Sequence, residues 1–519
     1  MRRQSKIEIR HTAIIIHDYN WNDCEKLEQL FSIYDKVYHR AYPKGIYYDS
    51  EKKDLYLPAG IDLYYVISCF GKDIWRKVYP DRYYRIDSVR MKYKPRDDDQ
   101  TKALQFCVGE GNYDKNRNAK QLSLNLSTGK GKTYIAITVF AYYCTKTMMI
   151  TSSINWIDQW FNKILEYTDL KPEEIYIIQG SASIAKLLKY KDCSKIKFFL
   201  CSHDTLNSYA SSNGWYAVTE LFQKLGIGIK IFDEAHLYFD SMMMIDFFTD
   251  VWRTYYLTAT PGRSDRKENY IYSLTFKNVP KIDLFDEEND PHTDYIAVLY
   301  NSHPTAVDIS NCNSSYGFSM HKYTNYLINT HAYYKIIHIM MDIIMKNTTE
   351  NGKTLVFIGT NHAILVTYWY MKYHFPLIDI GIYTTITPKE IKAEQLNKKI
   401  ILSTIKSSGT ALDIPNLEMT VNLNDPFKSE LVARQTLGRT RARGTRYVDL
   451  VDIGFTALQK FYNHKMKVYK KYASNIYEYM FNDQEIRNKM LDITKEDRER
   501  LESQDKSKMI QVIERVKRD

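Results

Sequence analysis

A lysine and a threonine, Lys132 and Thr133, directly follow a glycine-rich turn. An apolar alternating run, residues 122–126, precedes this turn, and a stretch of helical character, residues 134–143, follows it. Where a strand gives way to a helix at such a turn, several backbone N–H groups point at one place, which suits phosphate oxygens. Lys132 would then reach the β and γ phosphates of a nucleotide, and Thr133 would hold Mg²⁺. The phosphate-binding candidates are Ser127, Thr128, Gly129, Lys130, Gly131, Lys132 and Thr133.

The turn departs by one residue from the strict phosphate-loop pattern, which has glycine where this chain has Leu126. What remains is Thr-Gly-x-Gly-Lys-Thr. Taken alone, the same residues also fit a flexible glycine turn that happens to carry a lysine. The motifs further along the chain favour the phosphate-binding interpretation.

Two carboxylates, Asp233 and Glu234, follow the apolar run 229–232, which is typical of a buried strand. At the carboxyl edge of a parallel sheet they would point to the mouth where the phosphate loop opens. Asp233 would hold Mg²⁺ through its water shell, and Glu234 would polarise the attacking water. His236 would sense the γ phosphate. An isolated Asp-Glu-x-His is also found in solvated turns, but its position roughly a hundred residues after Lys132 favours nucleotide hydrolysis.

A further strand, within residues 255–261, ends in two small hydroxyl residues, Thr258 and Thr260. Hydroxyl groups at that place would hydrogen-bond the loop of Asp233 and Glu234. They would thereby couple the state of the nucleotide to the rest of the lobe. The alternative for these residues is an ordinary strand end.

Size and composition indicate a globular protein of two or three domains, since the chain has 519 residues and 44% of them are hydrophobic. The formal net charge of +10 suits a polyanionic partner such as nucleic acid. The seven cysteines are scattered and form no Cys-x-x-Cys pair, which favours reduced thiols over disulfides or a zinc site. No stretch is apolar enough to span a membrane. We therefore expect a soluble, cytoplasmic protein.

The order of strands and helices predicts an α/β protein with five parts. Between residues 122 and 284 short apolar strands alternate with helices, which is the pattern of a parallel sheet covered on both faces. A second such unit follows, and no sequence repeat relates the two. The expected parts are a small α+β domain (1–95), a first lobe (96–284), a connection (285–316), a second lobe (317–455) and a helical charged tail (456–519).

The last third of the expected N-terminal domain, residues 72–94, interleaves arginine and lysine with tyrosine and tryptophan. Cations next to flat rings suit a phosphate backbone and unstacked bases. A solvated basic face whose tyrosines pack inward explains the pattern equally well. The segment is thus a candidate for nucleic-acid binding and no more.

In order and spacing, these motifs resemble those of superfamily 2 helicases of the DEAH type. The resemblance extends from residue 94 to residue 452. Further stretches that carry it are residues 151–160 and 202–206 in the first lobe, and residues 354–358, 403–415 and 435–443 in the second. The wording of residues 408–415, Ser-Gly-Thr-Ala-Leu-Asp-Ile-Pro, is similar to the XPB-like branch and to poxvirus-type transcript-release helicases.

The resemblance implies two tandem RecA-like lobes that share one ATP site, with ATP and Mg²⁺ as cofactors. It also implies that an arginine from the second lobe stabilises the γ phosphate during transfer. The family has its second arginine where this chain has Ala442, so Arg439 and Arg443 are the candidates and Arg441 is the alternative. The further ATP-binding residues that it implies are Gly409, Asp413, Gln435 and, reading the adenine, Gln100.

The first hundred residues resemble the small N-terminal domain of phage branch-migration helicases of the UvsW type. This implies an ATP-dependent phage helicase that remodels double-stranded or branched DNA in replication, recombination or repair. An RNA-directed or transcript-release helicase is the alternative among motors. A nucleotide-gated scaffold without motor activity and the motor subunit of a restriction system are the other classes that remain open.

Overall fold

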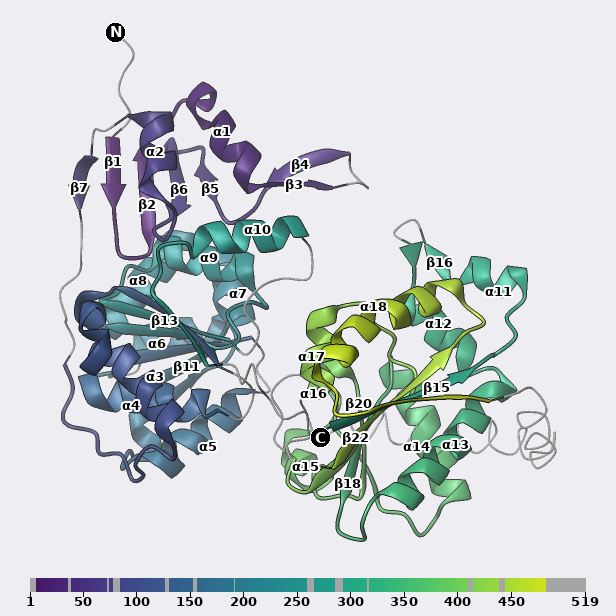
Figure 1. The fold of residues 1–519 in the computed structure, drawn as a ribbon. Coiled ribbons are helices and arrows are strands. Elements are labelled where there is room, and N and C mark those ends of the chain that lie inside the picture. Colours follow the sequence, from purple (N-terminus) through teal and green to yellow (C-terminus); the bar gives the residue numbers. More distant parts are fainter. Residues whose placement is uncertain are drawn as a thin grey trace. The chain divides into compact units, whose positions relative to one another are not determined.

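The computed structural model describes residues 6–35, 39–71, 74–77, 85–126, 130–152, 156–190, 192–258, 266–284, 293–314, 317–408, 414–437 and 444–481. The chain forms two compact units, Met1–Asp286 and Glu287–Asp519 (Figure 1). Each unit contains a seven-stranded parallel sheet, so the predicted pair of parallel-sheet lobes is confirmed.

Unit 1 begins with a small five-stranded sheet in the order β5-β6-β2-β1-β7. Its strands are antiparallel neighbours except for β1 and β7, which pair in parallel. A separate hairpin, β3–β4, follows the first helix directly, and that helix therefore ends at Phe31. The elements are β1 (Lys6–Ile9), β2 (Ala13–His17), α1 (Trp21–Phe31), β3 (Ser32–Asp35), β4 (Arg40–Pro43), β5 (Tyr47–Asp49), β6 (Asp54–Pro58), α2 (Leu63–Phe70) and β7 (Ile74–Lys77).

The first lobe follows in the same unit, with strand order β10-β11-β9-β12-β13-β8-β14. Its strands are β8 (Gln121–Leu126), β9 (Thr147–Thr151), β10 (Ile175–Ile178), β11 (Phe198–Ser202), β12 (Ile229–Phe232), β13 (Arg253–Thr258) and β14 (Lys281–Leu284). Its helices are α3 (Asp98–Val108), α4 (Lys132–Tyr143), α5 (Ile157–Tyr167), α6 (Ser181–Tyr190), α7 (His203–Asn213), α8 (Trp215–Leu225), α9 (Phe239–Phe248) and α10 (Arg266–Thr275), with a 3₁₀ segment at Gly111–Asn118.

Burial explains why the central elements of this lobe form where they do. All four residues of β12 are buried, as expected for a strand with neighbours on both sides and helices on both faces. Helix α5 buries Ile157, Trp160 and Ile164, which lie on one face at spacings of three and four residues. Strand β12 and helix α5 therefore bring Asp233, the residue after β12, close to the side chain of Trp160.

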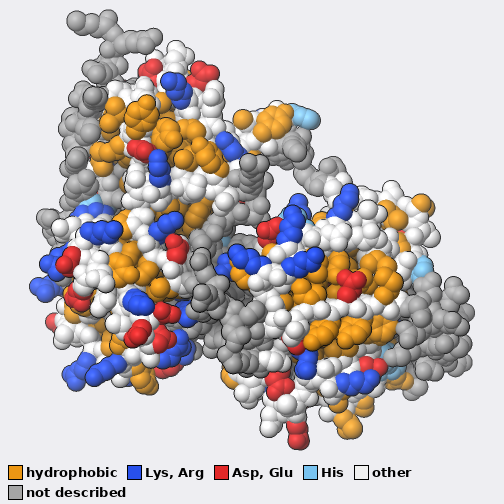
Figure 2. All heavy atoms as spheres, viewed as in Figure 1, with side chains coloured by type: hydrophobic (Ala, Val, Ile, Leu, Met, Phe, Trp, Pro, Cys, Tyr) orange, Lys and Arg blue, Asp and Glu red, His pale blue; other side chains and the backbone are white. Residues whose placement is uncertain are grey.

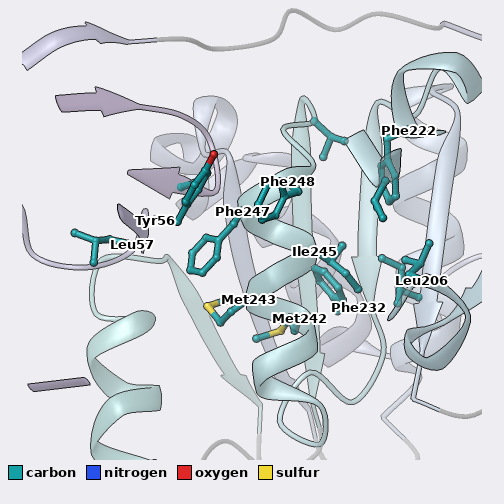
Figure 3. Packing of buried hydrophobic residues seen from close by; sticks show 14 of the residues in the cluster. Tyr56, Leu57, Leu206, Phe222, Phe232, Met242, Met243, Ile245, Phe247 and Phe248 are labelled. Atoms are coloured by element: carbon teal, nitrogen blue, oxygen red, sulfur yellow. The ribbon is translucent and has the colours of Figure 1, made fainter. Parts of the chain in front are cut away.

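The N-terminal sheet and the first lobe share one hydrophobic core. Figure 3 shows Tyr56 of β6 next to Phe247 and Phe248 of α9, and the rings of Tyr56 and Phe248 stack with centroids 5.1 Å apart. A polar contact adds to this packing, because the Thr12 hydroxyl donates to the carbonyl of Asp246 at 2.7 Å. The small sheet is thus built onto helix α9, which follows Asp233 and Glu234 in the chain.

Residues 85–94 belong with the first lobe and not with the N-terminal domain, in contrast to the predicted boundary at residue 95. Arg85 forms a β-bridge with Thr145, and Met91 forms one with Thr168 at the end of α5. Of the basic and aromatic candidate segment 72–94, residues 72–73 and 78–84 lie outside the described residues.

The sheet of unit 2 has the order β19-β20-β18-β21-β22-β15-β23. Its strands are β15 (Thr293–Tyr300), β18 (Lys353–Phe357), β19 (Ile380–Ile382), β20 (Ile400–Ser403), β21 (Leu417–Asn422), β22 (Thr445–Asp452) and β23 (Ile476–Met480), with a small hairpin of β16 (Asn313–Ser314) and β17 (Gly317–Phe318). Its helices are α11 (Ala306–Asn311), α12 (Met320–Leu327), α13 (His331–Asn347), α14 (Asn361–His374), α15 (Lys389–Gln395), α16 (Ile405–Ser408), α17 (Glu430–Leu437) and α18 (Thr456–Tyr472).

Two expected boundaries of this unit differ from the structure. Strand β15 lies within the expected connection 285–316, yet it pairs with β22 over its whole length and with β23 on its other side. Strand β23 lies within the expected tail 456–519 and closes the same sheet. Alternate residues of β15 pack into opposite cores, Val298 on one face of the sheet and Tyr295 on the other, so this strand is an integral part of the lobe.

The surface gives few clues to a partner. On the face seen in Figure 2, lysine and arginine side chains are interspersed with aspartate, glutamate and hydrophobic ones over both units. Among the residues that the structure describes, no helix is long and apolar enough to cross a membrane.

Candidate active site

Helix α4 begins at the end of the predicted phosphate loop, with Gly131 as its N-cap. Gly131 has φ +85°, which favours glycine, and a Cβ there would lie 2.2 Å from Nε2 of Gln100 and would displace the end of that side chain. The first turn of α4 contains no acidic residue that would compete for its N–H groups. Among the described residues no side chain caps this helix start, so its N–H groups suit an anion, and phosphate binding there stays a prediction.

Gln100, the candidate reader of the adenine, packs against this turn. It is buried, its Oε1 accepts a hydrogen bond from the N–H of Arg96 at 2.9 Å, and its Nε2 donates to the carbonyl of Lys130 at 3.5 Å. Asp97 caps α3 and thereby fixes the backbone of Gln100. In the structure Gln100 supports the loop, and its contact with a nucleotide stays a prediction.

Lys132 and Glu234 form an ion pair with 3.3 Å between Nζ and Oε1. Nζ of Lys132 also donates to the carbonyl of Leu126, the last residue of β8, at 3.4 Å. Only 13% of the lysine side chain and 5% of the glutamate side chain are exposed, so the pair is poorly screened by water. The sequence motifs around residues 132 and 234 therefore meet at one place, as predicted.

Glu234 has an unusual backbone conformation, with φ +48°. A non-glycine residue in this region is strained, and the surrounding hydrogen bonds hold it there. The N–H of Ala235 donates to the carbonyl of Leu257 in β13 at 2.9 Å, and the N–H of Leu237 donates to the carbonyl of Glu234 at 2.9 Å. The tight turn aims the Glu234 carboxylate back toward the start of α4.

Asp233 lies directly after β12 and is buried. Its Oδ2 accepts a hydrogen bond from the indole N–H of Trp160 in α5 at 2.9 Å, and its own N–H donates to the carbonyl of Ile150 in β9 at 3.0 Å. Burial, and secondarily the neighbouring charge of Glu234, raises the pKa of Asp233 to about 7. A divalent cation next to this carboxylate would offset both effects.

His236 connects this loop to strand β13. Its Nδ1 lies 2.7 Å from Oγ1 of Thr258 and 3.5 Å from Oε2 of Glu234, and all three side chains are buried. The predicted hydrogen bond from a hydroxyl at the end of β13 to the loop of Asp233 and Glu234 is therefore present. It provides a short path from Glu234 to the end of β13.

The structure brings together Gln100, Lys130, Gly131, Lys132, Asp233, Glu234, His236 and Thr258, with Thr133 in the first turn of α4. Gln435 lies in unit 2, on helix α17, and is nearly buried. The remaining predicted site residues lie outside the described residues: Ser127, Thr128, Gly129, Thr260, Gly409, Asp413, Arg439, Arg441 and Arg443.

Two contacts at this site were not foreseen from the sequence. One is the hydrogen bond from Trp160 to Asp233 described above. The other is the ion pair of Lys130 with Asp99, 2.9 Å between Nζ and Oδ2, which ties the loop to α3. The alternation of strands and helices is a partial signal for the first contact. It suggests a parallel sheet, in which the elements that follow β9 and β12 are neighbours.

The residues present fit a magnesium ion bound together with a nucleotide. Mg²⁺ prefers oxygen ligands, keeps several waters, and in phosphoryl-transfer sites is held by one or two protein groups plus phosphates. Asp233 supplies a buried carboxylate with a raised pKa, and Thr133 supplies a hydroxyl in the first turn of α4. No cluster of three or more His, Cys, Asp or Glu side chains suited to a metal occurs among the described residues.

A parallel sheet with a helix that begins at a glycine-lysine-threonine turn, and a strand that ends in Asp-Glu-x-His, form the arrangement of a RecA-like lobe. Residues 85–263, which contain all of these features, match the family described as type III restriction enzyme, res subunit. The chain is also similar to the general transcription and DNA repair factor IIH helicase/translocase subunit XPB of Enterocytozoon bieneusi (strain H348), 24% identical over 344 residues. This alignment covers 62% of the chain and 53% of the relative, so the chain spans about half the length of that relative. These similarities agree with the resemblance of the sequence motifs to those of superfamily 2 helicases.

Solved structures agree on the fold. S. cerevisiae Dbp5 bound to RNA and ADP BeF3 superimposes with a TM-score of 0.50 and 14% identity, covering 76% of this chain and 92% of that one. The structure of T4 UvsW aligns over 92% of this chain and 99% of its own length, with 14% identity and a TM-score of 0.35. The likeness to Dbp5 and the two seven-stranded parallel sheets confirm the predicted tandem RecA-like architecture.

Proposed function

We propose that the protein hydrolyses ATP and uses the cycle to move on nucleic acid as a helicase or translocase. The observation that supports this most directly is the Lys132–Glu234 ion pair at the start of α4, with 3.3 Å between Nζ and Oε1. It places a phosphate-binding cation and a candidate base for water at the same point.

The side chains suggest an order of events. Triphosphate oxygens compete with Glu234 for Lys132, since both are anions within reach of one ammonium group. When Lys132 moves to the phosphates, the Glu234 carboxylate is released to orient and deprotonate a water in line with the γ phosphate. His236, which contacts both Glu234 and Thr258, passes this change to β13. Bound Mg²⁺ supplies charge neutralisation at Asp233 and Thr133.

The second lobe completes this scheme. Arg439 and Arg443, with Arg441 as the alternative, are proposed to contact the γ phosphate, and Gly409, Asp413 and Gln435 are proposed to contribute to ATP binding. Closing and opening of two such lobes around one nucleotide would step the protein along a strand. The preceding residues Ser127, Thr128 and Gly129 are proposed to wrap the phosphates.

For the substrate we propose double-stranded or branched DNA, remodelled in replication, recombination or repair by a phage-type helicase. The similarity to XPB, described as a helicase/translocase of transcription and DNA repair, supports DNA. RNA is the second candidate, because contacts to a phosphate backbone do not distinguish the two by sequence. We propose that the protein acts in the cytoplasm, which for a phage protein is the cytoplasm of the host cell.

The test compares wild type with Glu234→Gln, which keeps the size of the side chain and removes the base. We expect ATP hydrolysis to fall about 100-fold while ATP affinity stays within a few-fold of wild type. Retention of wild-type turnover in Glu234→Gln would refute the assigned role. The same assay with duplex DNA, branched DNA and RNA at several salt concentrations identifies the substrate, because backbone binding weakens as salt rises. Strong stimulation by RNA alone would replace the DNA proposal.

A further inference from the structure

Helix α18 (Thr456–Tyr472) carries charge of one sign only. Its 17 residues include five lysines and one histidine, and no aspartate or glutamate. Surface helices often mix the two signs, because opposite charges three or four positions apart stabilise them. The helix therefore has no acidic group of its own to offset its lysines.

One face of α18 packs onto the sheet of unit 2 and fixes how the helix is turned about its axis. Nζ of Lys465 lies 2.5 Å from Oδ2 of Asp449 in β22. The ring of Tyr469 stacks on that of Tyr295 in β15, with centroids 3.8 Å apart. Four of the buried positions are spaced by four, three and four residues, as one face of a helix requires, and they are Leu458, Tyr462, Lys465 and Tyr469.

The exposed face of α18 repeats this spacing two positions further along the chain. A shift of two residues turns a helix by about 200°, so these side chains lie on the side away from the sheet. Lys470 lies beside them and is exposed as well. We call this set the lysine face, and it consists of Lys460, His464, Lys467, Lys470 and Lys471.

The charges of the lysine face are not neutralised by the part of the lobe that the structure describes. None of its four lysines forms an ion pair with a described carboxylate. Its acidic contact among the described residues is at His464, whose Nε2 lies 3.5 Å from Oε1 of Glu430 in α17. The four ammonium groups are therefore available to an anion from outside.

A neighbouring helix adds a cation at the end of the lysine face. Helix α18 packs beside α17 (Figure 1). Cζ of Arg434, in α17, lies 4.7 Å from the ring centroid of Tyr472, and Nζ of Lys471 lies 5.1 Å from the same centroid. The ring thereby stabilises two cations close to each other.

The length of the lysine face suits a polynucleotide. From Lys460 to Lys471 the helix rises by about 17 Å, and one strand of a duplex carries a phosphate about every 3.4 Å of its axis, so the face extends along roughly five phosphates. Lys467 lies three and four positions before Lys470 and Lys471, where like charges repel, and a row of phosphates would remove this repulsion. An acidic protein surface has no such regular repeat of charge, so nucleic acid is the favoured partner.

We propose that the lysine face of α18, together with Arg434, binds the phosphate backbone of nucleic acid without regard to base sequence. This inference rests on the proposed function, and it assigns to unit 2 a polynucleotide contact on residues outside the predicted motifs. Lysine meets phosphate as a point charge, so the contact carries no information about the bases. DNA and RNA share this backbone chemistry, and the experiment separates them.

The experiment removes the four lysine charges and keeps the helix. The test variant is Lys460→Gln/Lys467→Gln/Lys470→Gln/Lys471→Gln, because glutamine has nearly the helix propensity of lysine. The matched control removes the same charge from four exposed lysines in separate places, as Lys115→Gln/Lys186→Gln/Lys195→Gln/Lys346→Gln. The probes are duplexes of about 20 base pairs, which exceed the face in length, in two unrelated sequences and each as DNA and as RNA.

We expect the test variant to bind duplexes of both sequences at least ten-fold more weakly than wild type. The slope of log affinity against log salt should become less steep by about 3–4, since each lost phosphate contact removes about 0.9. The control should stay within about two-fold of wild type in affinity. Lys460→Gln/Lys467→Gln and Lys470→Gln/Lys471→Gln should each show about half the change in slope, and thermal unfolding checks that all variants fold.

A crosslink tests the place of the contact directly. p-Benzoylphenylalanine incorporated at His464, in the middle of the lysine face, should crosslink to the bound duplex under light. The same group at Lys346, on α13, should not. ATP turnover adds a functional readout, because the duplex concentration for half-maximal stimulation should rise at least ten-fold in the test variant while maximal turnover is kept.

The outcomes separate this inference from the proposed function. If wild type binds no polynucleotide, the proposed function fails and the lysine face has no such partner. If wild type hydrolyses ATP and binds a duplex, but the test variant matches the control or position 464 gives no crosslink, this inference alone is wrong and the lysine face is only solvated. A loss for one sequence and not the other would also overturn it, whereas a loss for DNA alone or RNA alone identifies the backbone that the face binds.

Discussion

Two lysine–carboxylate pairs lie next to strand β12, and they differ in how fully their hydrogen-bonding groups are used. The first joins Lys230, in the middle of the strand, to Asp246 of α9 at 2.6 Å, and neither side chain is exposed. The second joins Lys132 to Glu234 just beyond the end of the strand at 3.3 Å, with 13% of the lysine exposed. The two pairs are alike in chemistry and are separated by only a few residues of the chain.

The middle pair is saturated. Besides Asp246, Lys230 donates to the carbonyl and the hydroxyl of Thr249, at 2.9 and 2.7 Å, while Oδ2 of Asp246 accepts from the Tyr256 hydroxyl at 2.7 Å. Such a network fixes β12, β13 and α9 relative to one another. By contrast, the contacts of Lys132 with Glu234 and Leu126 are longer, at 3.3 and 3.4 Å, and lie at the start of α4. A buried charge pair therefore marks function where its partners can be exchanged for a ligand, and marks scaffold where they cannot.

Unit 2 contains a further example of the saturated kind. Lys465 and Asp449 are 2.5 Å apart and buried, and Asn422 and Tyr295 satisfy the carboxylate. Both partners line a small cavity at the carboxyl end of β21 and β22. Because no glycine-rich turn or helix start opens onto Lys465 among the described residues, a cavity beside a charge pair does not by itself indicate a site.

The largest effect on stability is expected at the saturated pair. Lys230→Met leaves Asp246 buried without its cation, and breaking a buried pair in this way costs about 3–5 kcal/mol of unfolding free energy. The double variant Lys230→Met/Asp246→Leu should recover most of that loss, because no uncompensated charge remains. Chemical denaturation of both variants measures this. Equal stability of Lys230→Met and wild type would contradict the assignment of this pair as scaffold.

The next largest effect, on activity, is expected at the exchangeable pair. Lys132→Ala removes the cation that we propose for the phosphates and should lower ATP turnover by about 100- to 1,000-fold, or about 3–4 kcal/mol of transition-state stabilisation. Its effect on unfolding should stay within about 1 kcal/mol, since the pair lies at the edge of the lobe. A Lys132→Ala variant with full ATPase activity would show the site assignment to be wrong and would leave a nucleic-acid scaffold as the alternative.

Acid should destabilise the first lobe through His203, which lies between the rings of Phe232 and Tyr238 and whose Nδ1 is 2.9 Å from the Ser241 hydroxyl. Burial lowers the pKa of His203 to about 3, so the folded lobe favours the neutral ring. The unfolding free energy that this preference contributes is complete above the unfolded pKa of about 6.5. It is lost as pH falls toward 3, by about 3 kcal/mol at pH 4. His203→Phe should lose this part of the acid sensitivity. Unfolding of both proteins from pH 7 to 4 measures it, and parallel pH profiles would contradict the prediction.

The sequence predicted the parts of the fold that local patterns encode. Strands such as 229–232 are short, apolar and followed by a polar switch, and the residues that follow them, Asp233 and Glu234, lie where parallel-sheet geometry requires. The contact of Lys132 with Glu234 could be predicted for the same reason. The two residues follow β8 and β12, and the carboxyl ends of these strands lie at the same edge of one parallel sheet.

Contacts that depend on tertiary packing could not be predicted in this way. The Trp160–Asp233 hydrogen bond joins residues 73 positions apart through the orientation of one side chain. The membership of β15 and β23 in the second sheet was missed because acidic and polar residues around 286–291 suggested a connection, and because all five residues of β23 are exposed, which gives an edge strand no apolar pattern. Pairing partners, and not local composition, define these strands.

The smallest effect is expected where the exchangeable pair passes its state to β13. Thr258→Val removes the hydroxyl 2.7 Å from Nδ1 of His236, and a hydrogen bond of this kind contributes about 1 kcal/mol. We therefore expect the stimulation of ATP turnover by nucleic acid to fall about five-fold. Thr254→Val is the matched control, since it lies on the same strand, is equally buried, and its hydroxyl has no hydrogen-bond partner among the described residues. If both variants lower stimulation equally, the loss reflects the packing of β13, and the path from Glu234 through His236 to Thr258 carries no signal.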